Sequence, residues 1–137
     1  MLRAIIVSLI LFFIQPPAQA EPATDADRMA IQAVITAQID AFRADDAARA
    51  YAHAAPSIQQ IFPTPESFMA MVKQGYEPVY RPQSFRFGQL GEDFSQWVSI
   101  IGPDGRTYEA LYTMQRQPDG TWRITGCSLL EISGTDV

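Results

Sequence analysis

Residues 94–130 read FSQWVSIIGPDGRTYEALYTMQRQPDGTWRITGCSLL, and two Pro-Asp-Gly tripeptides divide this stretch into three runs of alternating residues. Each tripeptide suits a type I turn followed by a left-handed glycine, which closes a three-residue hairpin loop. We therefore predict antiparallel strands at residues 94–102, 106–116 and 121–130. A similar run at residues 84–90 completes a four-stranded sheet.

The two turns also predict which residues lie opposite each other. When the residues that flank each turn are paired, Gln96 lies opposite Tyr112, and Tyr112 lies opposite Gly126. Ser128 is placed on the same face, opposite Ala110. Because this face is mostly apolar, we expect it to pack against helices.

The other face of the predicted sheet is polar, with one apolar row. In the same register Trp97 lies opposite Leu111, and Leu111 lies opposite Cys127. Glu109 belongs to this face and is expected to point away from the helices. Exposed apolar side chains are costly in water. The row therefore predicts either the interface of a two-fold homodimer or a patch that is shielded within the monomer.

The first half of the chain has the pattern of helices. In residues 25–44 the apolar residues recur at the spacing of one helical face; they are Ile31, Ile35, Ile39 and Phe42. Residues 47–54 form an Ala-rich second helix, which Pro56 is expected to end.

A third helix is expected to start at Thr64-Pro65-Glu66 and to end near Gly75. Residues 77–82 are expected to be extended, because residues before proline avoid the α region. Three N-terminal helices packed on one face of a curved, mainly antiparallel four-stranded sheet form an α+β domain, which is the predicted fold class.

Residues 1–20 have the pattern of a secretory signal peptide. Arg3 supplies a positive charge, residues 4–14 are a short apolar run, and Ala18-Gln19-Ala20 fits a cleavage site. At about 1.5 Å per residue, this run is too short to span a hydrocarbon core of about 30 Å. We expect a periplasmic or secreted protein with no stable membrane anchor after cleavage, and a single α+β domain at residues 21–137.

Export gives a direct prediction for the N-terminus of the mature protein. Protein recovered from the periplasm or the medium is expected to begin at Glu21, because cleavage follows the small residue Ala20. N-terminal sequencing checks this result. A membrane-bound product that retains Met1 would contradict it.

Composition excludes several classes of partner and cofactor. The 137 residues are 47% apolar, which is enough for one packed core. Fifteen acidic residues against ten basic ones leave no basic surface for nucleic acid, so no nucleic-acid partner is expected. One Cys and one His are too few for a Cys/His zinc site or a disulfide framework. We expect no metal and no cofactor.

Three short motifs carry a family resemblance. They are Ala41-Phe42-Arg43-Ala44-Asp45-Asp46, Met71-Val72 through Gly75-Tyr76, and Trp122-Arg123-Ile124 through Gly126. With them, residues 31–130 resemble the bacterial domain of unknown function family 4864, which brings no established activity and no catalytic residues. The order of helices and strands also resembles the cone-shaped, cystatin-like superfamily of nuclear transport factor two, ketosteroid isomerase and the polyketide cyclases. That resemblance implies a curved sheet wrapped around helices, often with a pocket.

Five residues are candidates for contacting a ligand in such a pocket. Gln96, Tyr112 and Ser128 are the polar side chains expected on the apolar face, whereas Tyr76 and Tyr80 lie where the helices lead into the sheet. The inner residues would orient a small apolar molecule. Alternatively, Gln96 and Tyr112 satisfy each other as ordinary buried polar groups.

These observations favour a non-catalytic protein that binds a small apolar molecule or a protein partner. The alternative is a cofactor-independent lyase or isomerase, which needs a carboxylate base inside an apolar pocket. Glu109 is expected on the outer face, and Asp40 only flanks the apolar stripe of the first helix. His53 is the only imidazole, and no nucleophile motif accompanies it. No catalytic residue is therefore assigned.

Overall fold

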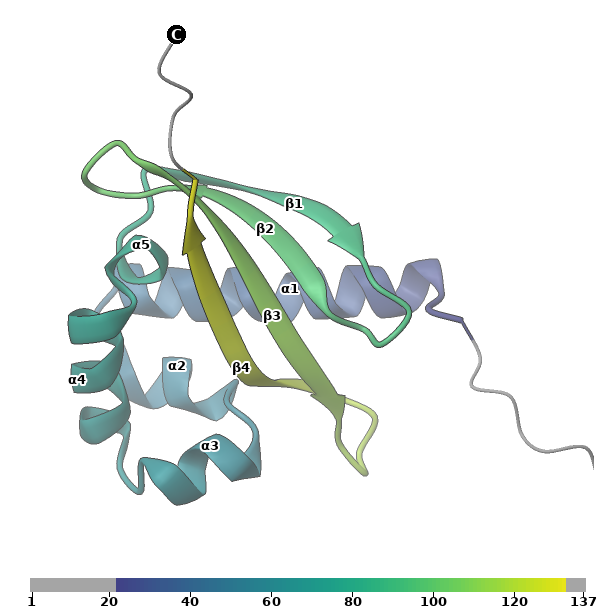
Figure 1. Cartoon of the computed structure of the whole chain (residues 1–137). Helices are drawn as coiled ribbons and strands as arrows, with labels where there is room; N and C mark the ends of the chain where they lie inside the picture. Colours follow the sequence, from purple (N-terminus) through teal and green to yellow (C-terminus); the bar gives the residue numbers. More distant parts are fainter. Residues whose placement is uncertain (1–21, 133–137) are drawn as a thin grey trace, which may run out of the picture.

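The computed structural model describes residues 22–132, so the predicted signal peptide lies outside the described residues. Within this part of the chain, helices precede a four-stranded antiparallel sheet of order β1-β2-β3-β4, and the predicted α+β class is confirmed (Figure 1). The helices are α1 (Asp25–Arg43), α2 (Ala47–Ala52), α3 (Pro56–Ile61), α4 (Pro65–Gly75) and α5 (Glu77–Tyr80). The strands are β1 (Ser84–Leu90), β2 (Gln96–Ile101), β3 (Thr107–Arg116) and β4 (Trp122–Glu131).

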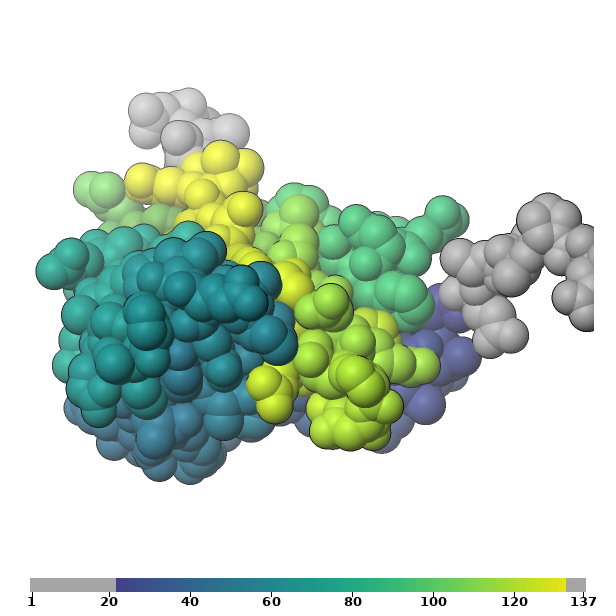
Figure 2. All heavy atoms as spheres, turned by 90° about the horizontal axis from the view of Figure 1, so that it is seen from below, coloured from purple at the N-terminus to yellow at the C-terminus, as the bar shows by residue number. Residues whose placement is uncertain are grey.

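The helices are arranged in two groups against the sheet. Figure 1 shows α1 crossing behind the strands, with α2 to α5 gathered at one end. From below, Figure 2 shows these shorter helices, in blue and teal, lying beside the yellow β4. Among residues 22–132 no helix combines the length and apolar character that a membrane span requires.

The long helix α1 is the central packing element of the domain. It begins at a capping box in which the Thr24 hydroxyl accepts from the backbone N–H of Asp27, and the Asp27 carboxylate accepts from that of Thr24. The predicted stripe is confirmed, because its four residues are at most 1% exposed: Ile31, Ile35, Ile39 and Phe42. Burying each of these side chains stabilises the fold by about 1.5–3 kcal/mol.

The predicted register of the first hairpin is confirmed. Gln96 pairs with Tyr112, and Ser99 pairs with Glu109. The Ser99 hydroxyl donates to the Glu109 carboxylate at 2.7 Å, on the face away from the buried Ala110. The turn glycine, Gly105, has a φ of +79°, as the turn type requires.

The strand before this hairpin starts later than predicted. β2 begins at Gln96 rather than at residue 94, because a tight turn occupies the preceding residues. In that turn the Gly91 N–H donates to the Ser95 carbonyl at 2.8 Å, and Phe94 has a φ of +64°. The Phe94 ring packs on Trp122, with 4.9 Å between ring centroids.

The register of the second hairpin was wrong beyond its first few pairs. Met114 lies opposite Ile124 as predicted, but Thr125 is an extra residue and shifts all later pairs by one. Tyr112 therefore lies opposite Cys127, not Gly126. Gly126 lies opposite Thr113, and these changes move Cys127 to the inner face.

A contact from the helical region explains where the bulge forms. The Ala55 N–H donates to the Ile124 carbonyl at 2.8 Å, and the Ile124 N–H donates to the His53 carbonyl at 2.9 Å. These bonds hold β4 on the side away from β3, just before the extra residue. The Thr125 hydroxyl also donates to the Thr113 hydroxyl oxygen at 2.8 Å, which satisfies the bulged side chain.

Two short helices were missed, and both contain proline. Pro56 begins α3 instead of only ending the segment before it. Residues 77–82 were predicted to be extended, but Glu77–Tyr80 form α5 with Pro78 in its first turn. A proline there removes no intrahelical hydrogen bond, because the first N–H groups of a helix have no partner within it.

Candidate functional site

An apolar cavity of about 270 Å³ lies between the helices and the inner face of β3 and β4. Its lining comes from helical and sheet segments distant in sequence. The lining residues are Gln38, Phe42, Ala54, Ile58, Phe62, Phe68, Met71, Val72, Tyr76, Val79, Tyr112, Ile124, Gly126 and Cys127. Several of them are partly exposed, so the cavity reaches the surface.

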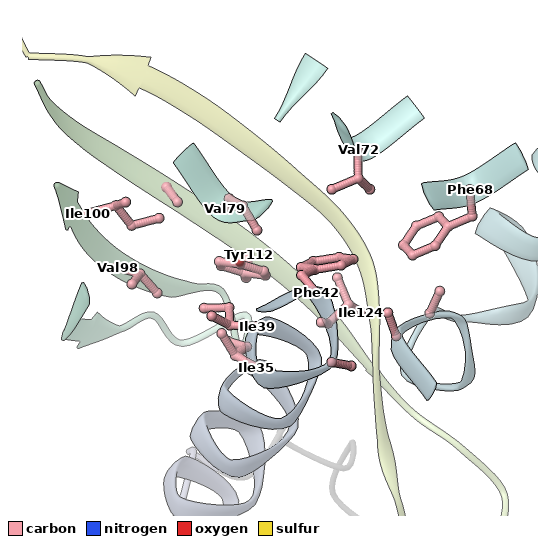
Figure 3. Packing of buried hydrophobic residues seen from close by; sticks show 14 of the residues in the cluster. Ile35, Ile39, Phe42, Phe68, Val72, Val79, Val98, Ile100, Tyr112 and Ile124 are labelled. Carbon is pink, nitrogen blue, oxygen red and sulfur yellow. The ribbon is translucent and has the colours of Figure 1, made fainter. Parts of the chain in front are cut away.

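Aromatic and aliphatic side chains of α1 and α4 form one wall. The ring centroids of Phe42 and Phe68 lie 6.2 Å apart. Figure 3 shows Phe42 next to Ile124 of β4, with Val72 and Phe68 beyond them. The wall is built from the apolar faces of two capped helices and from one strand.

The wall on the α3 side is held by hydrogen bonds to its backbone. The Tyr51 hydroxyl donates to the Phe62 carbonyl at 2.6 Å. The Gln59 side-chain amide donates to the Tyr51 carbonyl at 3.1 Å. These bonds hold Ile58 and Phe62, which line the cavity and remain partly exposed. The rim of the cavity therefore has a defined position.

The hydroxyl of Tyr112 is a buried polar group in the lining of the cavity. The Tyr112 side chain is 1% exposed, and its hydroxyl has no hydrogen-bond partner among the described residues. Burial raises the pKa of Tyr112 well above its usual value, and the adjacent Cys127 thiol, which lies beside the hydroxyl without hydrogen-bond geometry, raises it further, so the group stays a neutral hydroxyl. An unsatisfied buried hydroxyl costs about 1–3 kcal/mol. The site therefore carries a polar atom that the fold itself does not use.

Cys127 faces the cavity because of the bulge at Thr125. It was predicted in an outer row with Trp97 and Leu111, and the one-residue shift overturns that placement. Burial raises the pKa of the Cys127 thiol to about 12. Since the thiolate is the nucleophilic form of cysteine, this group is unreactive near neutral pH.

Gln96 is buried on the inner face, but it does not line the cavity. Its side-chain amide donates to the carbonyls of Gly88 at 2.9 Å and Trp97 at 2.8 Å. Its carbonyl oxygen accepts from Gln32 at 3.4 Å. The hypothesis that Gln96 and Tyr112 satisfy each other is therefore wrong, and the Gln96 amide is occupied by the irregular pairing of β1 and β2.

The two tyrosines at the helix-to-sheet connection have different surroundings. Tyr76, the C-cap of α4, lines the cavity. Tyr80 lies outside it, and its hydroxyl donates to the carboxylate of Asp45. Arg81 also donates to Asp45 at 2.9 Å. The hydrogen bond from Tyr80, with the Arg81 charge as a further cause, lowers the pKa of Asp45.

The outer face of the sheet holds the remaining candidates. Ser128 was predicted on the inner face, but the bulge places it opposite Leu111 on the outer face, where it is exposed. Trp97 lies opposite Leu111 as predicted and is 40% exposed. The roles of these residues in binding stay predictions.

The carboxylates and the imidazole considered as catalytic candidates do not line the cavity. Asp40 is exposed, with its carboxylate 4.0 Å from Arg43. His53 is the C-cap of α2, and burial, followed by the charges of Arg49 and Arg123, lowers its pKa. Within residues 22–132 no group of three or more His, Cys, Asp or Glu is arranged to hold a metal ion.

Sequence reasoning selected only two of the lining residues as candidate ligand contacts, Tyr76 and Tyr112. Another lining residue, Phe42, belonged to the apolar helical stripe predicted in residues 25–44. Ile58 and Phe62 had no signal, because α3 was not predicted.

The family model described as Domain of unknown function (DUF4864) matches residues 24–137 of the chain. The chain belongs to this family. Its DUF4864 match begins at Thr24, the N-cap of α1, and therefore includes all the described helices and strands. Neither the curated proteins nor the solved structures contain a match to this DUF4864 chain. The resemblance to the cone-shaped superfamily therefore stays a prediction.

Proposed function

We propose that this DUF4864 domain binds a small, mostly apolar molecule without transforming it. The observation that carries the proposal is the surface-accessible cavity of about 270 Å³, whose apolar lining includes Tyr112 with its buried, unpartnered hydroxyl. Apolar walls with a few polar groups are typical of small-molecule sites.

The chemistry of the lining favours binding over proton transfer. Among the described residues, no carboxylate and no imidazole lines the cavity. The two titratable groups nearest its polar part, Tyr112 and Cys127, both have raised pKa values and remain protonated. An isomerase-like reaction needs a base that is ionised at working pH. The described lining of the cavity therefore contains neutral polar groups but no such base.

The proposal also places this binding outside the cytoplasm. Its support is the charged, apolar and small-residue order of residues 1–20. A single cysteine that faces an apolar cavity as a protonated thiol suits an oxidising compartment, because it resists disulfide exchange.

Filling the cavity from its rim is expected to weaken binding while the fold is kept. Met71 lines the cavity and is partly exposed, so Met71→Trp adds volume without entering the tightly packed core. We expect naphthalene to bind the purified protein and its affinity for Met71→Trp to fall about tenfold or more. Both affinities are measured by NMR titration, in which the shifts of the backbone amide resonances are monitored as naphthalene is added.

Met29→Trp is the matched control for this experiment. Met29 is 71% exposed on α1 and is not part of the cavity lining, so the same substitution there is expected to leave naphthalene binding unchanged. Equal binding by Met71→Trp and the unchanged protein would argue against the cavity as the site.

A second proposal concerns the exposed face of the sheet, and its occupant is a second copy of this chain. The face carries Trp97 and Leu111, and Leu130 beside them is 61% exposed. The described helices pack on the other face (Figure 1). A two-fold axis would set this apolar patch against itself, as isologous dimers require.

The charges around the patch support a two-fold arrangement. One cross-strand row of this face contains Arg86, Ser99 and Glu109 in that order. A two-fold axis near Ser99 would bring Arg86 of each copy toward Glu109 of the other. The oligomeric state in sedimentation measurements tests this proposal.

A further inference from the structure

We infer that the ligand of this cavity is an uncharged molecule of about ten to twelve non-hydrogen atoms whose single oxygen hydrogen-bonds to the Tyr112 hydroxyl; this inference rests on the proposed function. The chemical class is a medium-sized alcohol, phenol or ketone. The inference rests on three properties of the cavity: its free polar groups, its lack of charge and its size.

The Tyr112 hydroxyl is the first of these free polar groups. It is buried and lacks a partner within residues 22–132, although nearly all buried polar groups in proteins are hydrogen-bonded. Figure 3 shows Tyr112 at the centre of the apolar cluster, close to Val79 and Ile39. The hydroxyl has almost no accessible surface and lies beside the Cys127 thiol, so a ligand oxygen in the adjoining cavity becomes its partner when these side chains shift.

Gln38 adds a second polar group to the same lining. Its side chain is buried, and its amide nitrogen donates to the Ala50 carbonyl at 3.1 Å. This bond uses one of the two N–H groups of the amide, and the carbonyl oxygen remains available as an acceptor. The lining therefore combines a hydroxyl from Tyr112 with an acceptor from Gln38, and a ligand hydroxyl or carbonyl is suited to such neutral groups.

The absence of charge from the described lining excludes ionised ligands. No Lys, Arg, Asp or Glu among residues 22–132 lines the cavity. A carboxylate or an ammonium group would lose its hydration there without gaining an opposite charge. Free fatty acids in their ionised form and amines are therefore disfavoured, whereas a neutral oxygen needs only one hydrogen bond.

The volume of the cavity limits the ligand. A cavity of about 150 Å³ is known to hold benzene, which has six carbon atoms. By proportion, the 270 Å³ of this cavity accommodates about ten to twelve non-hydrogen atoms. A naphthalene ring with one oxygen has this size and serves as a probe.

The experiment compares 2-naphthol with naphthalene, which lacks only the oxygen. Calorimetric titration of the purified protein and of Tyr112→Phe gives the ratio of the two affinities in each. We expect Tyr112→Phe to reduce the preference for 2-naphthol over naphthalene about five- to tenfold, because the hydrogen bond to the ligand oxygen is lost.

Tyr108→Phe is the matched control, because it removes a hydroxyl from the same strand. The Tyr108 hydroxyl donates to Asp104 at 2.9 Å and does not line the cavity, so the affinity ratio should not change. A measurement that needs no variant uses 2-naphthoate, the charged analogue. We expect it to bind the unchanged protein at least about tenfold more weakly than 2-naphthol.

The outcomes separate this inference from the proposed function. An unchanged affinity ratio in Tyr112→Phe, or tighter binding of 2-naphthoate than of 2-naphthol, overturns the inferred ligand class while naphthalene binding still supports an apolar site. Failure of the unchanged protein to bind either naphthalene or 2-naphthol overturns the proposed function itself.

Discussion

The variant Gln96→Glu is expected to lose about 3–5 kcal/mol of unfolding free energy at neutral pH. The Gln96 amide nitrogen donates to the carbonyls of Gly88 and Trp97, and the side chain is fully buried. A carboxylate oxygen in this position cannot donate and would lie against two carbonyl oxygens. Chemical denaturation of the variant and the unchanged protein measures the difference.

The effect of Gln96→Glu is also expected to depend on pH. Burial raises the pKa of the new carboxyl above the unfolded value of about 4.3. The folded variant then binds the proton more tightly than the unfolded chain, so its loss of stability relative to the unchanged protein is smallest below about pH 4 and grows as the pH rises toward the folded pKa. Gln89→Glu is the control, because Gln89 is exposed on the neighbouring strand. Equal stability of both variants would contradict the role assigned to the Gln96 amide.

The variant Trp97→Glu is expected to be a folded monomer, with a dimer dissociation constant about 30- to 1,000-fold higher than that of the unchanged protein. Trp97 lies on the outer face of the sheet and is 40% exposed, next to Leu111. A dimer would bury this ring, and a carboxylate in its place would lose hydration without a partner. Sedimentation equilibrium across the micromolar range measures the constant.

Ile61→Glu is the control for a general effect of exposed charge. Ile61 is 67% exposed on α3, which does not lie on the outer face of the sheet (Figure 1), so its replacement should change neither folding nor association. If the unchanged protein sediments as a monomer at all micromolar concentrations, the proposed dimer is wrong. The outer patch would then be available to a different partner.

Local signals were sufficient for α1 and for the first hairpin. The helical stripe from Ile31 to Phe42 is a repeat within one segment, and its burial follows from that repeat alone. The turn at Gly105 fixes the pairs on both sides of it, including Gln96 with Tyr112. Both features depend on residues that are close together in the sequence.

The features that were missed depend on contacts between distant residues. The shift in the register of β4 accompanies hydrogen bonds between residues 53–55 and Ile124. No pattern within the hairpin sequence predicts these bonds. Ser128 and Cys127 were consequently assigned to each other's faces. For α3, the sequence shows a proline that is compatible with ending one helix or starting the next, and packing decides between them.

The candidate site was only partly accessible to sequence reasoning for a related reason. Tyr112 was found because the register places it opposite Gln96, a polar residue on an apolar face. The cavity beside it depends on how side chains from several elements fill space. No pairing rule predicts that Phe62 and Met71 leave an opening at the rim.

The bulge at Thr125 divides β4 into two halves with opposite alternation. Before it, even-numbered positions such as Trp122 and Ile124 face the core, whereas beyond it the odd-numbered Cys127 and Leu129 do. In a survey of substitutions along this strand, the positions that tolerate polar residues should therefore switch from odd to even numbers at the bulge. A single deletion at Thr125 would restore one continuous alternation and leave Cys127 and Leu129 on the inner face, because every later residue keeps its partner in β3.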